Sequence, residues 1–148
     1  METHAAEEAV ALEKQSSLVG SAGNGPWSNN SLHATFVGTA AGTVLASFLG
    51  GDPSSSLPIT MWFQYTFDGE GHVDRAFGEA TIGGKPSGLI KASGTYRLDP
   101  ATGMGMETIT LPDGRTPNRR FSLSNDNTRL HWVSVDPGFQ FKGTMQKQ

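Results

Sequence analysis

Hydrophobic and polar side chains alternate most clearly between residues 58 and 67. The odd-numbered positions there carry large apolar or aromatic side chains, namely Ile59, Met61, Phe63, Tyr65 and Phe67. The even-numbered positions between them are mostly polar. A period of two places every second side chain on the same face of an extended strand. We therefore expect a β-strand here with one buried face.

Similar short runs, each ended by turn residues, follow to the C-terminus. Asp68-Gly69 and Asp136-Pro137-Gly138 are typical turn sequences, because Asp and Gly tolerate the backbone angles of tight turns. No helical pattern separates the runs, which favours an antiparallel meander over βαβ units. The expected strands cover residues 32–39, 43–49, 58–67, 72–82, 89–98, 104–111, 118–124, 129–135 and 139–145. They predict an all-β fold, an antiparallel up-and-down β-barrel of about eight strands.

The first 30 residues differ from this pattern and are treated as an N-terminal segment, with residues 31–148 as a single barrel domain. Residues 2–16 favour helix, but Val10 and Leu12 give only a thin apolar stripe, so a short docked helix and a frayed tail both stay open. Trp27 lies in a glycine-rich loop. It is interpreted either as an aromatic plug at the end of the barrel or as a lid over a pocket.

Charge and composition exclude several function classes. The net charge is −3, and the eleven Lys and Arg residues are scattered, so we expect no nucleic-acid partner. The chain has no cysteine, which excludes disulfides and thiolate chemistry. The acidic N-terminus lacks the basic and apolar regions of a signal peptide, and no segment is long and apolar enough to span a membrane. These features predict a cytoplasmic protein with no membrane partner.

Short glycine-marked strands resemble those of calycin-type barrels, meaning lipocalin-like and allene-oxide-cyclase-like domains. The resemblance rests on Gly94-Thr95-Tyr96, on Asp136-Pro137-Gly138 and on the later Gly143-Thr144, and it covers most of residues 31–146. It implies a lumen that holds a ligand. It transfers no catalytic residue to this chain.

Motifs of metal, phosphate and triad chemistry do not occur in the sequence. The four histidines, His4, His33, His72 and His131, have no ligand spacing, and no acidic cluster flanks them. The glycines lead into strands rather than helices, and no Gly-x-Ser-x-Gly is present. We therefore expect neither a metal site nor a cofactor.

The hairpin between residues 67 and 73 leaves two registers open, because a slip of one residue exchanges the two faces of a strand. A turn of four residues pairs Phe67 with His72. The interior is then lined by small side chains, namely Ala76, Gly78 and Ala80.

A turn of five residues pairs Phe67 with Val73 instead. Arg75 and Glu79 would then face the lumen, where two charged groups must pair or meet a ligand. In this register Tyr65 lies on the neighbouring strand as a second donor. The catalytic candidates are accordingly Glu79, Tyr65 and Arg75.

The pattern leaves the faces of other charged residues open. The direction of Glu107 is not resolved by its neighbours. Arg119 and Arg120 are adjacent and must face opposite sides, so one is expected to pair with an acid and the other to be solvated.

The combined prediction is a barrel that binds a hydrophobic organic molecule and folds it for cofactor-free cyclisation or isomerisation. A non-catalytic carrier and a solid-core interaction module remain alternatives, and a homodimer is a further open point. The expected ligand-binding residues are the inward aromatic and methionine side chains, namely Phe36, Met61, Phe63, Phe77, Tyr96, Trp132 and Phe141.

Overall fold

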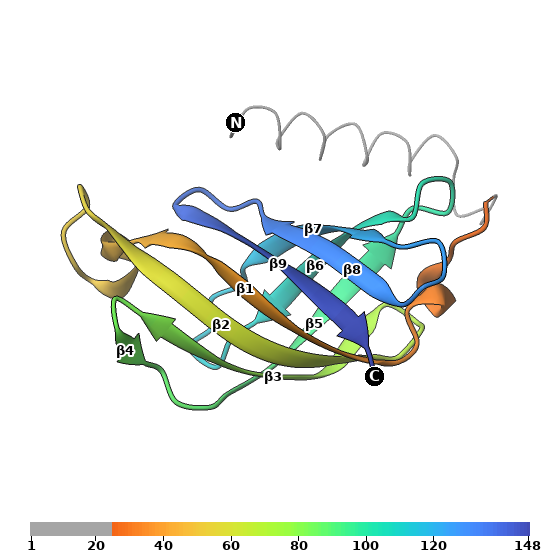
Figure 1. Ribbon diagram of the computed structural model, residues 1–148, viewed down its shortest axis with the longest axis horizontal. Coiled ribbons are helices and arrows are strands. Elements are labelled where there is room, and N and C mark those ends of the chain that lie inside the picture. Colours follow the sequence, from red (N-terminus) through yellow and green to blue (C-terminus); the bar gives the residue numbers. More distant parts are fainter. Residues whose placement is uncertain (1–24) are drawn as a thin grey trace.

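The computed structural model describes residues 25–148, and these form an antiparallel β-barrel (Figure 1). Two 3₁₀ turns, η1 (Asn29–Ser31) and η2 (Ala46–Leu49), are the helical elements of the described chain. The strands are β1 (Thr35–Leu45), β2 (Ser56–Phe67), β3 (His72–Ile82), β4 (Lys85–Pro86), β5 (Ile90–Leu98), β6 (Met104–Thr110), β7 (Asn118–Leu123), β8 (Arg129–Ser134) and β9 (Phe139–Lys147). The helix expected over residues 2–16 lies outside the described residues.

The strand order is that of an up-and-down barrel. Strands β5 to β9 pair in sequence, β1 pairs with both β2 and β9, and β2 pairs with β3. The β3–β5 pairing completes the ring, and the short β4 forms a hairpin on the end of β3. The predicted fold class, an antiparallel barrel of about eight strands, is confirmed.

One expected strand boundary is wrong. The runs 32–39 and 43–49 were predicted as two strands, but Thr35–Leu45 is one continuous strand that pairs with β2 from end to end. The small residues between the runs, Ala40, Ala41 and Gly42, therefore make no turn. The chain turns only after Leu45, where η2 ends at Gly50 in the left-handed conformation (φ 78°).

The inner face of the barrel follows the alternation read from the sequence. On β2 the side chains of Ile59, Phe63, Tyr65 and Phe67 are buried. Burying such side chains is the main favourable contribution to the folding of a small β-domain. The expected buried face of this strand is confirmed.

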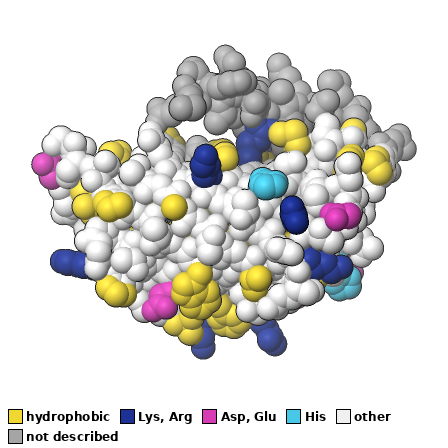
Figure 2. Space-filling model, viewed as in Figure 1, with side chains coloured by type: hydrophobic (Ala, Val, Ile, Leu, Met, Phe, Trp, Pro, Cys, Tyr) yellow, Lys and Arg dark blue, Asp and Glu magenta, His cyan; other side chains and the backbone are white. Residues whose placement is uncertain are grey.

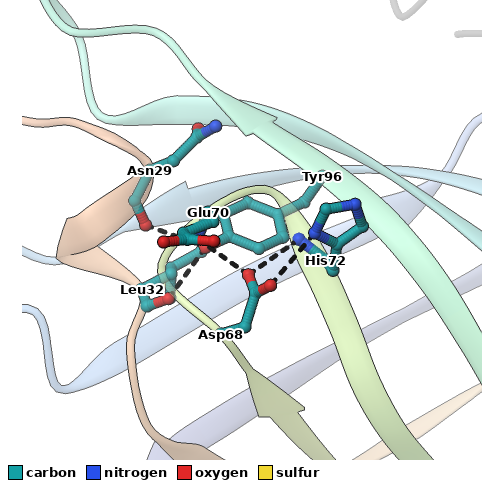
Figure 3. Close-up of polar contacts among 6 residues, drawn as sticks. All are labelled: Asn29, Leu32, Asp68, Glu70, His72 and Tyr96. Atoms are coloured by element: carbon teal, nitrogen blue, oxygen red, sulfur yellow. Dashed lines mark hydrogen bonds and ion pairs between the residues drawn. The ribbon is translucent and has the colours of Figure 1, made fainter.

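One end of the barrel, here called the closed end, is packed with aromatic rings. Phe67 makes edge-to-face contacts with Phe36 and Tyr96, at centroid distances of 5.6 and 5.3 Å. The Tyr96 hydroxyl lies 2.8 Å from the carbonyl oxygens of both Asn29 and Leu32, so η1 is tied across this end (Figure 3). The closed end therefore combines a filled core with a satisfied polar group.

Trp27 also belongs to the closed end. Its ring lies so close to Gly103 that a Cβ on that glycine would come within 2.8 Å of it, and the backbone N–H of Trp27 bonds Pro100 at 3.3 Å. Gly103 stands at the turn between β5 and β6. The plug interpretation of Trp27 fits this position, whereas the cavity described below lies at the other end.

The β2–β3 hairpin combines the two registers that the sequence left open. Phe67 pairs with Val73, as the five-residue turn requires, but Tyr65 pairs with Ala76. Asp68 accepts hydrogen bonds from the backbone N–H groups of Glu70 and His72, at 2.7 and 2.9 Å, and from the His72 ring (Figure 3). These bonds, led by the one from the His72 backbone, lower the pKa of Asp68 and hold the turn.

A β-bulge explains how both registers contribute. β3 contains one extra residue in the Asp74–Arg75 region. The pairing of β3 with β2 and its pairing with β5 both shift in register there. A bulge shifts the alternation by one residue. Val73 therefore faces inward before the bulge and Ala76 after it, and the lining predicted by the four-residue turn is restored.

Candidate functional site

The end of the barrel opposite Trp27, here called the open end, contains a cavity of about 500 Å³. It lies where β1 ends and β2 begins, beside the chain segments that join β6 to β7 and β8 to β9. We name it the open-end cavity. Its apolar lining consists of Val44, Leu49, Ile59, Met61, Ala80, Ile82, Ile90, Leu111, Pro117, Pro137, Phe139 and Phe141. Its polar lining consists of Arg115, Thr116, Asp136 and Arg119.

A smaller pocket of about 80 Å³, here called the inner pocket, adjoins the open-end cavity. The two share several lining residues, namely Met61, Ala80, Ile90, Leu111 and Arg119. Ala76, Gly78 and Ala92 also line the inner pocket, and their small size leaves space opposite the aromatic side chains of β2. The pairing of β3 with β5 ends at Gly78 and Ile90, so the barrel wall is less tightly closed here.

Arg119 is the charged residue common to both spaces. It stands on β7 directly opposite Glu107 of β6, and only 6% of it is exposed. Its Nη1 donates a hydrogen bond to the Tyr65 hydroxyl and lies 3.6 Å from Oε1 of Glu107. The guanidinium of β7 thus contacts a phenol from β2 and a carboxyl group from β6.

Aromatic rings hold the guanidinium in place. Its Cζ lies 4.1 Å from the centroid of the Trp132 ring, within the range of a cation–π contact. Trp132 can approach because β9 carries Gly143, where a Cβ would come within 2.9 Å of the indole. Phe63 and Tyr65 lie farther from the guanidinium, at 5.8 and 5.5 Å.

Burial changes the acid–base properties of this group of residues. Loss of solvent raises the pKa of Glu107 from its ordinary value of 4.5 to about 7, although the neighbouring Arg119 charge opposes the rise. Burial likewise raises the pKa of Tyr65 to about 12, against the influence of Arg119. Near neutral pH, Glu107 can therefore gain or lose a proton, while Tyr65 keeps its own.

Several polar atoms of the site have no hydrogen-bond partner among the described residues. They are Oε1 of Glu107, Nε of Arg119 and Nε1 of Trp132, all of them buried. Buried polar atoms are normally hydrogen-bonded, and an unpaired one reduces stability. Among these three residues, Arg119 lines both cavities, and its unpaired donor indicates a place for a polar group of a ligand.

The structure places two of the predicted catalytic residues away from this site. Arg75 is exposed and pairs with Thr66 at the bulge, and Glu79 accepts a hydrogen bond from the indole of Trp62 at 3.3 Å. Trp62 is itself 46% exposed, on the outer face of the barrel. The lumen positions proposed for Arg75 and Glu79 are therefore wrong, because the bulge turns both outward.

Hydrophobic side chains gather along the lower edge of Figure 2, where β2 and β3 run in Figure 1.

Tyr65, the third catalytic candidate, does lie inside and contacts Arg119. The predicted ligand-binding residues divide into three groups. Met61, Phe63 and Phe141 line one or both cavities, and Phe77 borders the inner pocket from the outer face together with Trp62 and Glu79.

The remaining predicted ligand-binding residues line neither cavity. Trp132 lies against the Arg119 guanidinium. Phe36 and Tyr96 are part of the closed end, where ring packing and the bonds to η1 occupy them. These positions do not support the assignment of Phe36 and Tyr96 to a ligand cavity.

Arg119 and Glu107 were not identified as site residues from the sequence, although a signal for Arg119 is present. Arg119, Phe121 and Leu123 alternate on one face of β7, and both apolar residues are buried. Because residues two positions apart lie on the same face of a strand, Arg119 is predicted to face inward with them. Arg119 is the arginine that pairs with an acid, but Arg120, at 5% exposed, is not the solvated residue that was expected.

Comparisons with known proteins leave the site to be interpreted from its geometry. No family model, no curated protein and no solved structure matches this chain. Within residues 25–148, no cluster of three or more His, Asp or Glu side chains could hold a metal ion. No helix in that range is long and apolar enough to cross a membrane.

Proposed function

We propose that this protein is a calycin-like barrel that binds an apolar organic molecule in the open-end cavity, with an oxygen-bearing end of the ligand at Arg119. The observation that carries the proposal is an apolar cavity of about 500 Å³ that reaches a buried arginine with an unpaired Nε. Ligand pockets commonly combine apolar walls with a few placed polar groups. The solid-core module is the less favoured alternative, because the open end contains this space.

Binding can be tested with melting curves and tryptophan emission on a panel of apolar acids, ketones and alcohols. Trp132 contacts Arg119, so a ligand that reaches the site should shift its emission saturably. The closed-end Trp27 serves as an internal comparison, and Trp132→Phe should remove most of the shift. A panel that gives neither a saturable shift nor a higher melting temperature would contradict the proposal.

Catalysis is a second candidate function, and the pairing of Arg119 with Tyr65 is the observation that favours it. Two preorganised donors next to an apolar cavity can stabilise negative charge that develops on a carbonyl oxygen. The walls would fold a flexible substrate into a reactive conformer, and neither step needs a cofactor. Cofactor-free cyclisation or isomerisation of a carbonyl compound fits these groups.

The catalytic candidate requires its own experiment. Tyr65→Phe should lower turnover about 10- to 1,000-fold with little change in ligand affinity, since the lost donor acts most strongly in the transition state. The assay measures product formed from a panel of flexible carbonyl compounds, with Tyr96→Phe as the matched closed-end control. Affinity changes without any product in the wild type would leave the protein as a carrier.

A further inference from the structure

Arg119 already has one acidic partner, which is Glu107. It lies 3.6 Å from Nη1 of Arg119, and 3% of its side chain is exposed. Arg119 lines the open-end cavity and Glu107 does not. Glu107 therefore contacts the guanidinium without bordering the ligand space.

The contact between these two groups is incomplete. At 3.6 Å the distance exceeds that of a good hydrogen bond, and Oε1 of Glu107 has no hydrogen-bond partner among the described residues. An arginine can offer five N–H donors in a planar fork that matches a carboxylate. Arg119 uses Nη1 for Tyr65, and its Nε is unpaired. The guanidinium can thus donate hydrogen bonds to a second, better-placed carboxylate that enters from the cavity.

We propose that the preferred ligand is an apolar carboxylic acid, whose carboxylate replaces Glu107 as the partner of Arg119 while Glu107 takes up a proton. This inference rests on the ligand-binding function proposed above. One cation cannot satisfy two buried anions, because the unpaired anion would carry the full cost of desolvation. Proton uptake by Glu107 removes that cost and leaves one positive and one negative charge in the site.

The other groups around Glu107 do not titrate in the same range. Its cross-strand neighbours are Arg119 on β7 and Tyr96 on β5, and Tyr65 of β2 interacts with it electrostatically. Burial raises the pKa of each tyrosine to about 12, so both stay neutral. The raised pKa of Glu107, about 7 before binding, makes uptake of one proton feasible near neutral pH.

The test compares decanoic acid with methyl decanoate and decanol by isothermal titration calorimetry. We expect the acid to bind about tenfold or more tightly than the two neutral probes at pH 6.5, because its carboxylate makes charge-assisted bonds to Arg119. Above pH 7 its affinity should fall by about tenfold per pH unit, since one proton is taken up on binding. The neutral probes should show no such pH dependence.

Glu107→Gln removes the internal competitor and supplies the decisive variant. Decanoate affinity at pH 8 should rise about tenfold and lose its pH dependence, while methyl decanoate affinity should not change. Glu70→Gln is the matched control, because Glu70 is exposed on the β2–β3 turn. It should behave like the wild type.

The outcomes separate this inference from the proposed function. Equal binding of acid, ester and alcohol would overturn the inference and leave the ligand barrel intact. Absence of binding by all three probes would contradict both. If Glu107→Gln does not fold, proton uptake by the wild type decides: titrations in buffers of different ionisation enthalpy should show one proton bound with decanoate, and none would refute the exchange.

Discussion

The two ends of the barrel each place a tyrosine on the inner face, but in different surroundings. At the closed end, the Tyr96 hydroxyl bonds the carbonyl oxygens of Asn29 and Leu32, and its ring packs on Phe67. Toward the open end, the Tyr65 hydroxyl accepts a bond from Arg119, whose own surroundings include unpaired polar atoms. Satisfied polar groups are typical of structural packing, and unsatisfied ones of a binding site. The closed end thus has the features of structural packing, and the open end is where we propose that the ligand binds.

The largest expected effect is on the stability of the closed end. Phe67→Ala removes a ring that is 1% exposed and should lower the free energy of unfolding by about 3–5 kcal/mol. Ligand affinity should stay the same under conditions where the variant is folded. Urea denaturation followed by circular dichroism measures the first quantity. An unchanged denaturation midpoint would show that the closed end does not stabilise the barrel.

A smaller effect concerns the dependence of stability on pH. The folded pKa of Glu107 lies above its ordinary value, so the folded state binds the proton more tightly than the unfolded state. Its contribution to the free energy of unfolding should therefore fall by about 3 kcal/mol from pH 4.5 to pH 7 and stay level above. The difference between wild type and Glu107→Gln across this range isolates the effect. Parallel pH curves for the two proteins would contradict the assignment.

The two tyrosines provide the most direct contrast between the ends. Tyr96→Phe should lower the free energy of unfolding by about 1–2 kcal/mol, since it leaves buried carbonyl groups with one partner fewer, and should not alter ligand affinity or turnover. Tyr65→Phe should have its main effect on turnover, with little change in ligand affinity. Denaturation curves and the product assay for both variants test this. Equal effects on both quantities would remove the distinction between the ends.

The smallest effect on stability is expected from filling the cavity. Ala80 lines both the open-end cavity and the inner pocket. Ala80→Leu should change the free energy of unfolding by about 1 kcal/mol or less, because the added atoms enter open space. Binding of apolar ligands should nevertheless be weakened at least about tenfold. Melting curves with and without decanoic acid measure both results, and undiminished binding would place the ligand elsewhere.

Local alternation predicted most of the strands and the barrel. The buried face of β2 follows from residues 59–67, and tight turns between short strands exclude βαβ units. The merged strand β1 was missed because small residues can equally mark a turn or continue a strand. Pairing with β2 and β9, which is not local, decided between these possibilities.

The site was harder to predict because it depends on a single bulge and on contacts between distant strands. One extra residue near Asp74 turned Arg75 and Glu79 outward, and neither turn length considered alone includes that shift. Arg119 could have been found from its phase with Phe121. Its partner Glu107 could not be placed, since only the β6–β7 register sets the two residues opposite each other.

A crystal structure with 10-bromodecanoic acid tests the central claim most directly, because anomalous scattering locates the bromine independently of the protein phases. We expect bromine at the apolar mouth of the open-end cavity, near Phe139 or Leu49, and the carboxylate within hydrogen-bond distance of Arg119. The closed end should show no ligand. Bromine outside the barrel only, or a cavity filled by side chains, would contradict the assignment of ligand binding to the open end.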